Sequence, residues 1–288
     1  MICNLCPRRC SAVRGEYSGS GFCNMGTVPV VARIAPHFGE EPCISGKRGS
    51  GAVFFSGCTM RCRYCQNYEI SAMNQGRIMT PEQLADSYRR LEAMGVHNIN
   101  LVTADHFAPA VVKSLELHRP SVPVVYNCSG YTSPVVLHML EGLVDVYLPD
   151  FKYGNDALAV SLSQAPNYVS TATVAVQEMV FQTGTPTLDD DGMLTKGVMV
   201  RHLILPAHTR NSIEVIEHIR RHFGKQVLFS LMCQYVPWGE VKNDPKLGRT
   251  ITKREAEKVK RELFRSGMDG FTQDLTAATA EYIPQWDI

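Results

Sequence analysis

From residue 51 onward the sequence alternates short runs of β-branched and aromatic residues with longer amphipathic stretches. This alternation is typical of parallel strands joined by crossover helices, because each connection must return the chain to the same edge of the sheet. We therefore expect six strands, at residues 52–56, 98–103, 122–126, 143–148, 198–204 and 227–232.

Helix starts between these strands point to the same architecture. Residues 80–83 (Thr-Pro-Glu-Gln) predict a capping box with proline at the first helical position, and Thr252 with Glu255 predicts a second one that opens a helix over residues 255–264. Asn211 with Glu214 indicates a third start. The predicted fold class is α/β, either a partial (β/α)6 TIM-like barrel or a doubly wound parallel sheet. In both, the active site lies at the carboxyl ends of the strands.

Composition narrows the class of partner. The 288 residues carry 29 Lys+Arg and 28 Asp+Glu, so a net charge of +1 gives no overall attraction to nucleic acid or anionic lipid. The longest apolar stretches, such as residues 52–55, are far shorter than the roughly 18 residues of a membrane span, and no signal sequence is evident. We expect a cytoplasmic protein without nucleic-acid or membrane partners. Its predicted parts are a Cys-rich metal-binding lobe (1–50), the barrel (51–265) and a C-terminal tail packed on the barrel (266–288).

The ten cysteines are placed unevenly. Five lie within the first 43 residues, three lie between residues 58 and 65, and only Cys128 and Cys233 follow. A secreted disulfide framework normally belongs to a much shorter chain with a signal peptide. The clustered cysteines therefore predict metal ligands in a reducing cytoplasm, while the two isolated ones suit small buried residues.

A triplet of cysteines directly follows the first predicted strand, at Cys58, Cys62 and Cys65. Three thiolates within eight residues can hold one side of a cubane iron–sulfur cluster and leave the fourth iron open to another ligand. A structural zinc ion would need a fourth Cys or His nearby, and His97 is distant in sequence. The triplet therefore predicts a [4Fe-4S] cluster with one open corner.

The triplet, with Tyr64 before its last cysteine, resembles the motif of the radical S-adenosylmethionine (SAM) superfamily. The string from Gly57 to Asn67 is similar to that of pyruvate formate-lyase activating enzymes. Along essentially its whole length the chain resembles the activating-enzyme-like branch, through Cys-x2-Cys-Pro near the start and through residues 39–42, 45–46, 127–131, 147–153 and 201–203. The resemblance implies a partial barrel of the radical SAM type with a small N-terminal metal-binding lobe.

The resemblance also implies a mechanism. The cluster on Cys58, Cys62 and Cys65 would bind the amino and carboxylate groups of SAM, with further cofactor contacts from Tyr64 and Asn67. One electron through the cluster would cleave SAM to methionine and a 5′-deoxyadenosyl radical, which removes a hydrogen atom from a substrate. The implied partners are SAM, an electron donor such as flavodoxin or ferredoxin, and a glycyl-radical enzyme.

Two strand ends are expected to supply SAM contacts. Thr103 and Asp105 follow the second strand, where activating enzymes hold the SAM ammonium with Ser-Gly-Gly-Glu-Pro. That string is absent here, so Asp105 either replaces its glutamate or is a polar loop residue, and His106 could serve substrate. Asn127 and Ser129 follow the third strand, where the resemblance implies hydrogen bonds to ribose and the residues alone indicate a turn.

The later strands add charged residues. Asp150 and Lys152 follow the fourth strand on one side of an extended segment, where the lysine matches one that contacts SAM; an ion pair closing the barrel mouth is the alternative. Arg201 matches an arginine near SAM, and its burial would require a carboxylate partner. His202 is expected on the opposite face. Gln234 follows the sixth strand, where adenine or substrate could lie.

Four thiols lie within 21 residues of the N-terminal lobe, at Cys3, Cys6, Cys10 and Cys23. They are enough for one closed tetrahedral site, and zinc or a second [4Fe-4S] cluster could occupy it. We favour zinc slightly because a small turn-rich lobe needs a structural ion, and a lobe without metal is a further alternative. Cys43 is left without a role. Basic neighbours could screen the thiolates or form a docking face for an electron donor, namely Arg8, Arg9 and Arg14.

Three classes of function follow. A glycyl-radical activase needs an open groove at the strand ends, whereas an enzyme for a small molecule or peptide would enclose its substrate between the lobe and the tail. A non-catalytic metal-binding protein is the third class, and the charged set Asp150, Lys152 and Arg201 argues against it.

Overall fold

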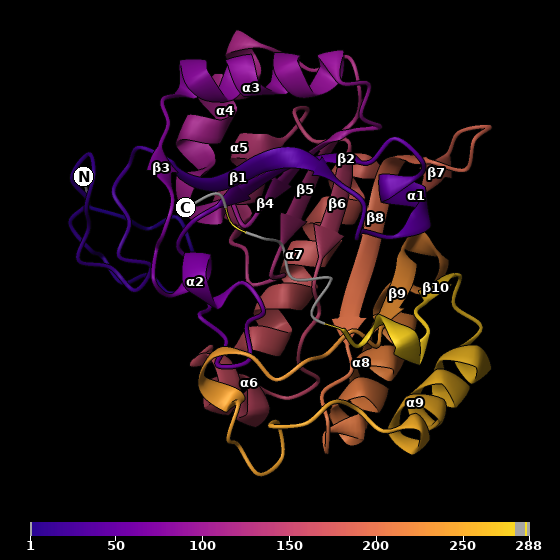
Figure 1. Cartoon of the computed structure of the whole chain (residues 1–288). Coiled ribbons are helices and arrows are strands. Elements are labelled where there is room, and N and C mark those ends of the chain that lie inside the picture. Colours follow the sequence, from indigo (N-terminus) through magenta and orange to yellow (C-terminus); the bar gives the residue numbers. More distant parts are fainter. Residues whose placement is uncertain (1, 280–285, 287–288) are drawn as a thin grey trace.

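The computed structural model describes residues 2–279 and 286. Its centre is a sheet with the strand order β10-β9-β8-β6-β5-β4-β2-β1-β3, and β7 pairs with β8 beside this path (Figure 1). From β2 to β10 neighbouring strands are parallel, whereas β1 is antiparallel to β2 and β3. The strands are β1 (Val30–His37), β2 (Ser50–Phe55), β3 (Arg77–Ile78), β4 (Ile99–Val102), β5 (Val124–Cys128), β6 (Val146–Pro149), β7 (Thr187–Leu188), β8 (Leu194–Leu203), β9 (Leu228–Met232) and β10 (Gly270–Thr272).

Helices connect the parallel strands and cover the outside of the curved sheet (Figure 1). Pairs such as α3 with α4 and α8 with α9 pack side by side. In the part of the chain that the structure describes, no helix is long and apolar enough to cross a membrane. The helices are α1 (Pro42–Ser45), α2 (Tyr68–Ser71), α3 (Pro81–Ala93), α4 (Ala108–Leu117), α5 (Pro134–Leu140), α6 (Asp156–Ser163), α7 (Tyr168–Thr183), α8 (Thr209–His222) and α9 (Lys253–Ser266).

The central parallel strands β2, β4, β5 and β6 are buried on both faces. Successive side chains point alternately toward the helices and toward the barrel interior. The helix-side core includes Val53, Leu101, Tyr126 and Val200, and the interior is filled by Cys43, Ile44, Val125, Val146, Leu148, Leu194 and Met199. The partial barrel of parallel strands is thus confirmed, and its interior is a packed core below the strand ends.

Residues 30–37 correct one expectation. The sequence predicts a small turn-rich lobe over residues 1–50, but β1 within it pairs with β2 from Val31↔Phe55 to His37↔Ser50. Directly after β1, the buried helix α1 enters the barrel interior, where Cys43 and Ile44 pack on inward-facing side chains. Cys43 is therefore part of the barrel core. The division of the chain at residue 50 remains a prediction, although β1 belongs to the sheet.

All six predicted strands are present, with shifted ends. β5 extends to Cys128, so Asn127 lies within the strand, and β8 begins at Leu194. The capping boxes at Thr80 and Thr252 are confirmed, with helices starting at the next residue. In both boxes, side chains accept hydrogen bonds from backbone N–H groups that have no partner within the helix.

Asn211 corrects a second expectation, because it does not cap a helix. α8 begins at Thr209, and the buried Asn211 side chain instead accepts a hydrogen bond from Gly154 N at 2.8 Å and donates to Lys152 O at 3.0 Å. It thereby fixes the segment that follows β6. In the predicted tail, β10 pairs with β9 and the ring of Trp286 packs edge-on against Phe54; residues 280–285 and 287–288 lie outside the described part.

Candidate active site

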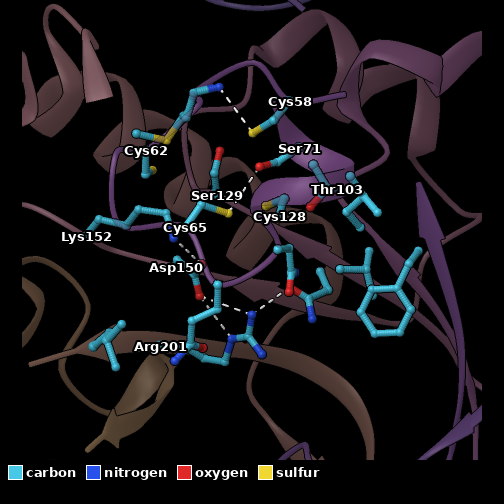
Figure 2. A pocket seen from close by; sticks show the side chains of 18 of the residues that line it. Cys58, Cys62, Cys65, Ser71, Thr103, Cys128, Ser129, Asp150, Lys152 and Arg201 are labelled. Atoms are coloured by element: carbon cyan, nitrogen blue, oxygen red, sulfur yellow. Dashed lines mark hydrogen bonds and ion pairs between the residues drawn. The ribbon is translucent and has the colours of Figure 1, made fainter. Parts of the chain in front are cut away.

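A cavity of about 200 Å³ opens at the carboxyl ends of the parallel strands (Figure 2). The thiols of Cys58, Cys62 and Cys65 line one side, and charged side chains from β6 and β8 line the other. The cavity therefore lies where parallel α/β architectures carry their active sites.

Two residues of the loop that carries the three cysteines have positive φ angles. Gly57 has φ +79°, and Arg61 also has a positive φ of +52°. Within the loop, Met60 N donates to Cys58 Sγ at 3.3 Å, and Ser71 Oγ donates to Cys65 Sγ at 3.3 Å (Figure 2). Such donors stabilise sulfur ligands that carry negative charge, because they are oriented before the ligand binds.

The three thiols suit a cluster with one open corner. They interact electrostatically with one another, and none is in a disulfide. Cys128 also lines the cavity, but its thiol interacts with Thr132 and lies near Asp105. The described chain thus brings three cysteines together and directs the fourth nearby one elsewhere, which fits a [4Fe-4S] cluster whose fourth iron takes an external ligand.

Burial makes two of these thiols, Cys58 and Cys65, poor acids in the absence of metal. Burial raises the pKa of Cys58, and burial followed by the charges of Cys62 and Cys58 raises the pKa of Cys65 to about 12. The ammonium group of Lys152 opposes part of this shift at Cys58. Cluster binding must therefore displace thiol protons, and loading should depend on pH.

Four charged residues form a network opposite the cysteines. Arg201 Nη1 lies 2.7 Å from Glu40 Oε2, and Arg201 Nε donates to Asp150 Oδ1 at 3.1 Å. Asp150 Oδ2 lies 2.5 Å from Lys152 Nζ. Asn127 joins the network by accepting from Arg201 at 2.6 Å and donating to Glu40 at 3.1 Å. The carboxylate partners expected for Arg201 are therefore Glu40 and Asp150.

Asp150 and Lys152 remain ionised although both are buried. Burial alone would raise the pKa of Asp150, but Lys152 and Arg201 outweigh it, so the pKa of Asp150 is lowered. Burial alone would lower the pKa of Lys152, but Asp150 and the thiols of Cys62 and Cys65 outweigh it, so that pKa is raised. Lys152 is thus a protonated donor between a carboxylate and the cysteine side of the cavity.

Twelve residues predicted for the central site line this cavity: Cys58, Cys62, Cys65, Tyr64, Asn67, Thr103, Asn127, Ser129, Asp150, Lys152, Arg201 and Gln234. Thr103 holds a positive φ of +62° while its N–H donates to Asn127 O. This is backbone strain of the kind that clusters at functional sites.

Asp105 is not among the lining residues. Its buried carboxylate accepts from Thr132 Oγ1 at 2.6 Å, and burial raises its pKa to about 6. His106 also turns away from the cavity, because its Nε2 pairs with Ser56 O at 2.8 Å. As expected, His202 lies on the outer face of β8, between Phe151 O and Ser212 Oγ. The structure therefore does not bring Asp105 to the place of an ammonium ligand.

Sequence reasoning missed Glu40, which comes from the loop after β1. Its Oε1 accepts from Asn127 and, at 3.3 Å, from Asn100, so it joins strands β4, β5 and β8 at the cavity floor. The adjacent Glu41 is buried, and burial raises its pKa. The only signal in the sequence was the string Gly-Glu-Glu-Pro, which was matched without a role. His37, Gln66 and Ser71 were also missed.

The four predicted N-terminal ligands, Cys3, Cys6, Cys10 and Cys23, line a separate space of about 10 Å³. Among the residues described, no set of three or more Cys, His, Asp or Glu side chains is arranged to hold a metal ion. This statement covers both cysteine sets. The metal predicted for the N-terminal lobe, zinc or a second cluster, therefore remains a prediction.

Comparisons with known proteins bear on the barrel. A family model described as the radical SAM superfamily matches residues 52–233, which is more than half of the chain. The uncharacterized protein MJ0674 of Methanocaldococcus jannaschii is 28% identical over 267 residues, covering 89% of this chain and 72% of that protein.

Solved structures share the fold at low identity. A radical SAM methyltransferase from Sphaerobacter thermophilus has a TM-score of 0.54 at 15% identity, over 77% of this chain and 65% of that chain. Streptococcus suis SuiB bound to the precursor peptide SuiA has a TM-score of 0.50 at 13% identity, over 78% of this chain and 48% of that chain. The chain thus spans less than two thirds of either solved chain. Because the matched family segment contains both the barrel and its three-cysteine loop, the chain belongs to the radical SAM superfamily.

Proposed function

We propose that this radical SAM enzyme removes a hydrogen atom from its substrate, in the manner of the enzymes that activate glycyl-radical enzymes. Superfamily membership implies a [4Fe-4S] cluster and the cleavage of SAM by a radical mechanism. The observation that carries the proposal is one cavity in which three cysteines face a charged network. The string from Gly57 to Asn67, which is similar to that of activating enzymes, supports the choice of reaction.

The residues around the cavity would have separate roles. Cys58, Cys62 and Cys65 would hold the cluster, which supplies the electron that cleaves SAM to methionine and the 5′-deoxyadenosyl radical. Lys152 would donate to the SAM carboxylate, since its ammonium is held protonated by Asp150. Ser129 also lines the cavity, and its hydroxyl would donate a hydrogen bond to the ribose of SAM.

Arg201 and Glu40 would hold the floor of the cavity rather than carry chemistry. Both side chains are about 10% exposed, and their ion pair is bonded to Asn127. Because its charged groups are paired, the floor of the cavity is rigid and keeps the reacting groups in place. It also excludes water, so that side reactions of a carbon radical compete less with hydrogen transfer.

A second candidate is hydrogen abstraction from a small molecule or peptide. The cavity is small, and Glu40, from the loop after β1, lines its floor. An enclosed floor favours a substrate that enters only from the strand ends. A flexible glycine loop of a partner enzyme and a compact small molecule both meet this condition.

Two further proposals concern the surroundings. The N-terminal thiols would hold zinc or a second cluster, and reduced flavodoxin or ferredoxin would deliver electrons. All ten cysteines are free thiols, which supports a reducing, cytoplasmic location.

The proposal is tested by anaerobic reconstitution with iron and sulfide, followed by reduction with dithionite in the presence of SAM. We expect 5′-deoxyadenosine from the parent and from Cys233→Ala, whose thiol is buried outside the cavity, and none from Cys62→Ala. Product formation by Cys62→Ala at the parental rate would overturn the proposal. A glycyl radical formed on a candidate partner enzyme would select the activase over the small-molecule enzyme.

A further inference from the structure

The charged side chains that line the central cavity are paired with one another. Among the described residues of its lining, the carboxylates belong to Glu40 and Asp150 and the cations to Lys152 and Arg201. The guanidinium of Arg201 donates to Glu40 through Nη1 and to Asp150 through Nε. Its Nη2 donates to Asn127, and Lys152 Nζ lies 2.5 Å from Asp150 Oδ2 (Figure 2). Apart from the three cluster thiols, each charge on this described lining therefore already has a partner.

A charged substrate would disturb these pairs. An ion that enters the cavity loses water, and its burial is favourable only where a group of opposite charge is available to it. To pair with a substrate cation, Glu40 or Asp150 would have to leave Arg201, which is only 9% exposed. Lys152 has its role at the SAM carboxylate in the proposed function. The cavity therefore disfavours anionic and cationic substrates alike.

Two pairs of apolar side chains line the same cavity. Phe54 lies beside Val102 where β2 pairs with β4, and Leu203 lies beside Met232 where β8 pairs with β9. In the order of the sheet, β5 and β6 lie between these two pairs. An apolar group of a substrate that packs against either pair is removed from water, which favours its binding.

His37 supplies an uncharged polar group to this cavity. It is the last residue of β1, and its ring lies edge-on to that of Phe54, with the ring centroids 5.7 Å apart. Burial, followed by the charges of Arg33 and Arg201, lowers the pKa of His37, so its ring is neutral at pH 7. No other described residue forms a hydrogen bond with the ring nitrogens. A neutral imidazole donates at one nitrogen and accepts at the other, so this ring can bind a polar group of a ligand.

We infer that the part of the substrate inside this cavity is uncharged, carries an apolar group that packs on the two apolar pairs, and has an amide or hydroxyl group that forms a hydrogen bond with His37. The inference rests on the proposed function and names the substrate class of the same site. A compact neutral amide or alcohol meets these conditions, whereas a phosphorylated, carboxylated or aminated molecule does not. A bare glycine segment is uncharged as well, but it offers no apolar side chain.

The first test compares probes that differ from N-acetyl-leucinamide by one group. N-acetyl-leucine adds a negative charge and leucinamide a positive one, and saturation-transfer NMR on the reconstituted enzyme with SAM measures the dissociation constants. We expect the uncharged amide to bind at least about tenfold more tightly than either charged probe, because each charge would be buried without a free partner. Equal affinity for a charged probe, or no binding of the uncharged amide, would overturn the inference.

N-acetyl-glycinamide tests the apolar pairs. It should bind about tenfold more weakly than N-acetyl-leucinamide, because it has no side chain to remove from water. Equal affinity of the two amides would overturn this part of the inference and favour a bare glycine segment as the substrate. None of these measurements depends on SAM cleavage. If the parent makes 5′-deoxyadenosine with dithionite, a failed inference therefore leaves the proposed function standing.

Variants of His37 test its hydrogen bond. His37→Leu should weaken the binding of N-acetyl-leucinamide about five- to tenfold, whereas His37→Gln, which keeps an uncharged donor and acceptor, should stay within about threefold of the parent. The matched control is His138→Leu, at a side chain of α5 that is 62% exposed, and it should bind the amide like the parent. An equal loss in both His37 variants, or no loss in His37→Leu, would refute the hydrogen bond to substrate.

Discussion

The two cysteine regions differ in depth, shape and surroundings. The central thiols line a cavity of about 200 Å³ whose far wall carries Lys152, Asp150 and Arg201. The N-terminal thiols line a space of about 10 Å³ and have carbonyl-bonded arginines as neighbours. Three ligands and room beside them suit a site that binds a substrate, whereas four ligands and no room suit a closed site.

The difference extends to what stabilises each region. The central site is built on the ends of buried parallel strands, so its charged residues are held by a barrel core. The N-terminal segment has only isolated bridges before β1, and a small lobe of this kind gains much of its order from a bound metal. The residues proposed to bind SAM thus lie on the part of the molecule that the barrel core holds in place.

The largest expected effect separates the two regions by activity. In Cys65→Ser, SAM cleavage driven by dithionite should fall by about a thousandfold or more, since the cluster that binds SAM loses a ligand. In Cys10→Ser it should stay within about threefold of the parent, because Cys10 lines the separate N-terminal space and not the central cavity. The measurement is 5′-deoxyadenosine formation by the reconstituted enzymes. Equal losses in both variants would mean that the two regions form one site.

The next effect concerns the barrel side alone. Arg201→Leu leaves the buried carboxylates of Glu40 and Asp150 without their shared partner, so the free energy of unfolding should fall by about 3–5 kcal/mol. The matched control is Arg210→Ala, which removes a solvent-exposed pair with Glu214 and should cost less than about 0.5 kcal/mol. Urea denaturation measures both. A small cost at Arg201 would show that the network is solvated.

Much of the barrel side could be predicted from sequence because its signals are local. Short β-branched runs mark the parallel strands, and side chains that follow such strands meet at one edge of the sheet. For that reason the sequence predicts Asp150, Lys152 and the three central cysteines at one site. The resemblance to activating enzymes added Ser129 and Arg201.

The positions of the Glu40 and Asp105 side chains could not be predicted from local sequence patterns. Glu40 meets Arg201 across 161 residues, through an antiparallel strand outside the β/α repeat, and no periodicity reports such pairing. Asp105 lies in a short 3-10 turn (Asp105–Phe107) that directs its carboxylate to Thr132. The conformation of this turn determines where the Asp105 side chain points, and the sequence alone does not predict that conformation.

A third variant acts at the boundary between the regions. A Cβ at Gly57 would lie 2.5 Å from Met25 Cγ in the N-terminal segment, and the residue has φ +79°. Gly57→Ala should therefore cost about 2–4 kcal/mol, the sum of backbone strain and overpacking. Gly95→Ala, at φ +80° with open space around it, should cost only the strain, about 1–2 kcal/mol. Equal costs, measured by urea denaturation, would mean that the N-terminal segment packs loosely on the cysteine loop.

The smallest expected effect tests whether water reaches His202 on the outer face of β8. Burial lowers the pKa of His202 from 6.5 to about 4, so between these pH values the unfolded chain binds a proton that the folded chain does not. This residue should therefore reduce stability by about 1.4 kcal/mol per pH unit as pH falls through that range. His202→Gln should remove that part of the slope, whereas Ser212→Ala removes a hydrogen bond to the ring and should keep the slope while lowering stability throughout. Urea denaturation at several pH values measures these slopes, and an unchanged slope in His202→Gln would show that water reaches the outer face of β8.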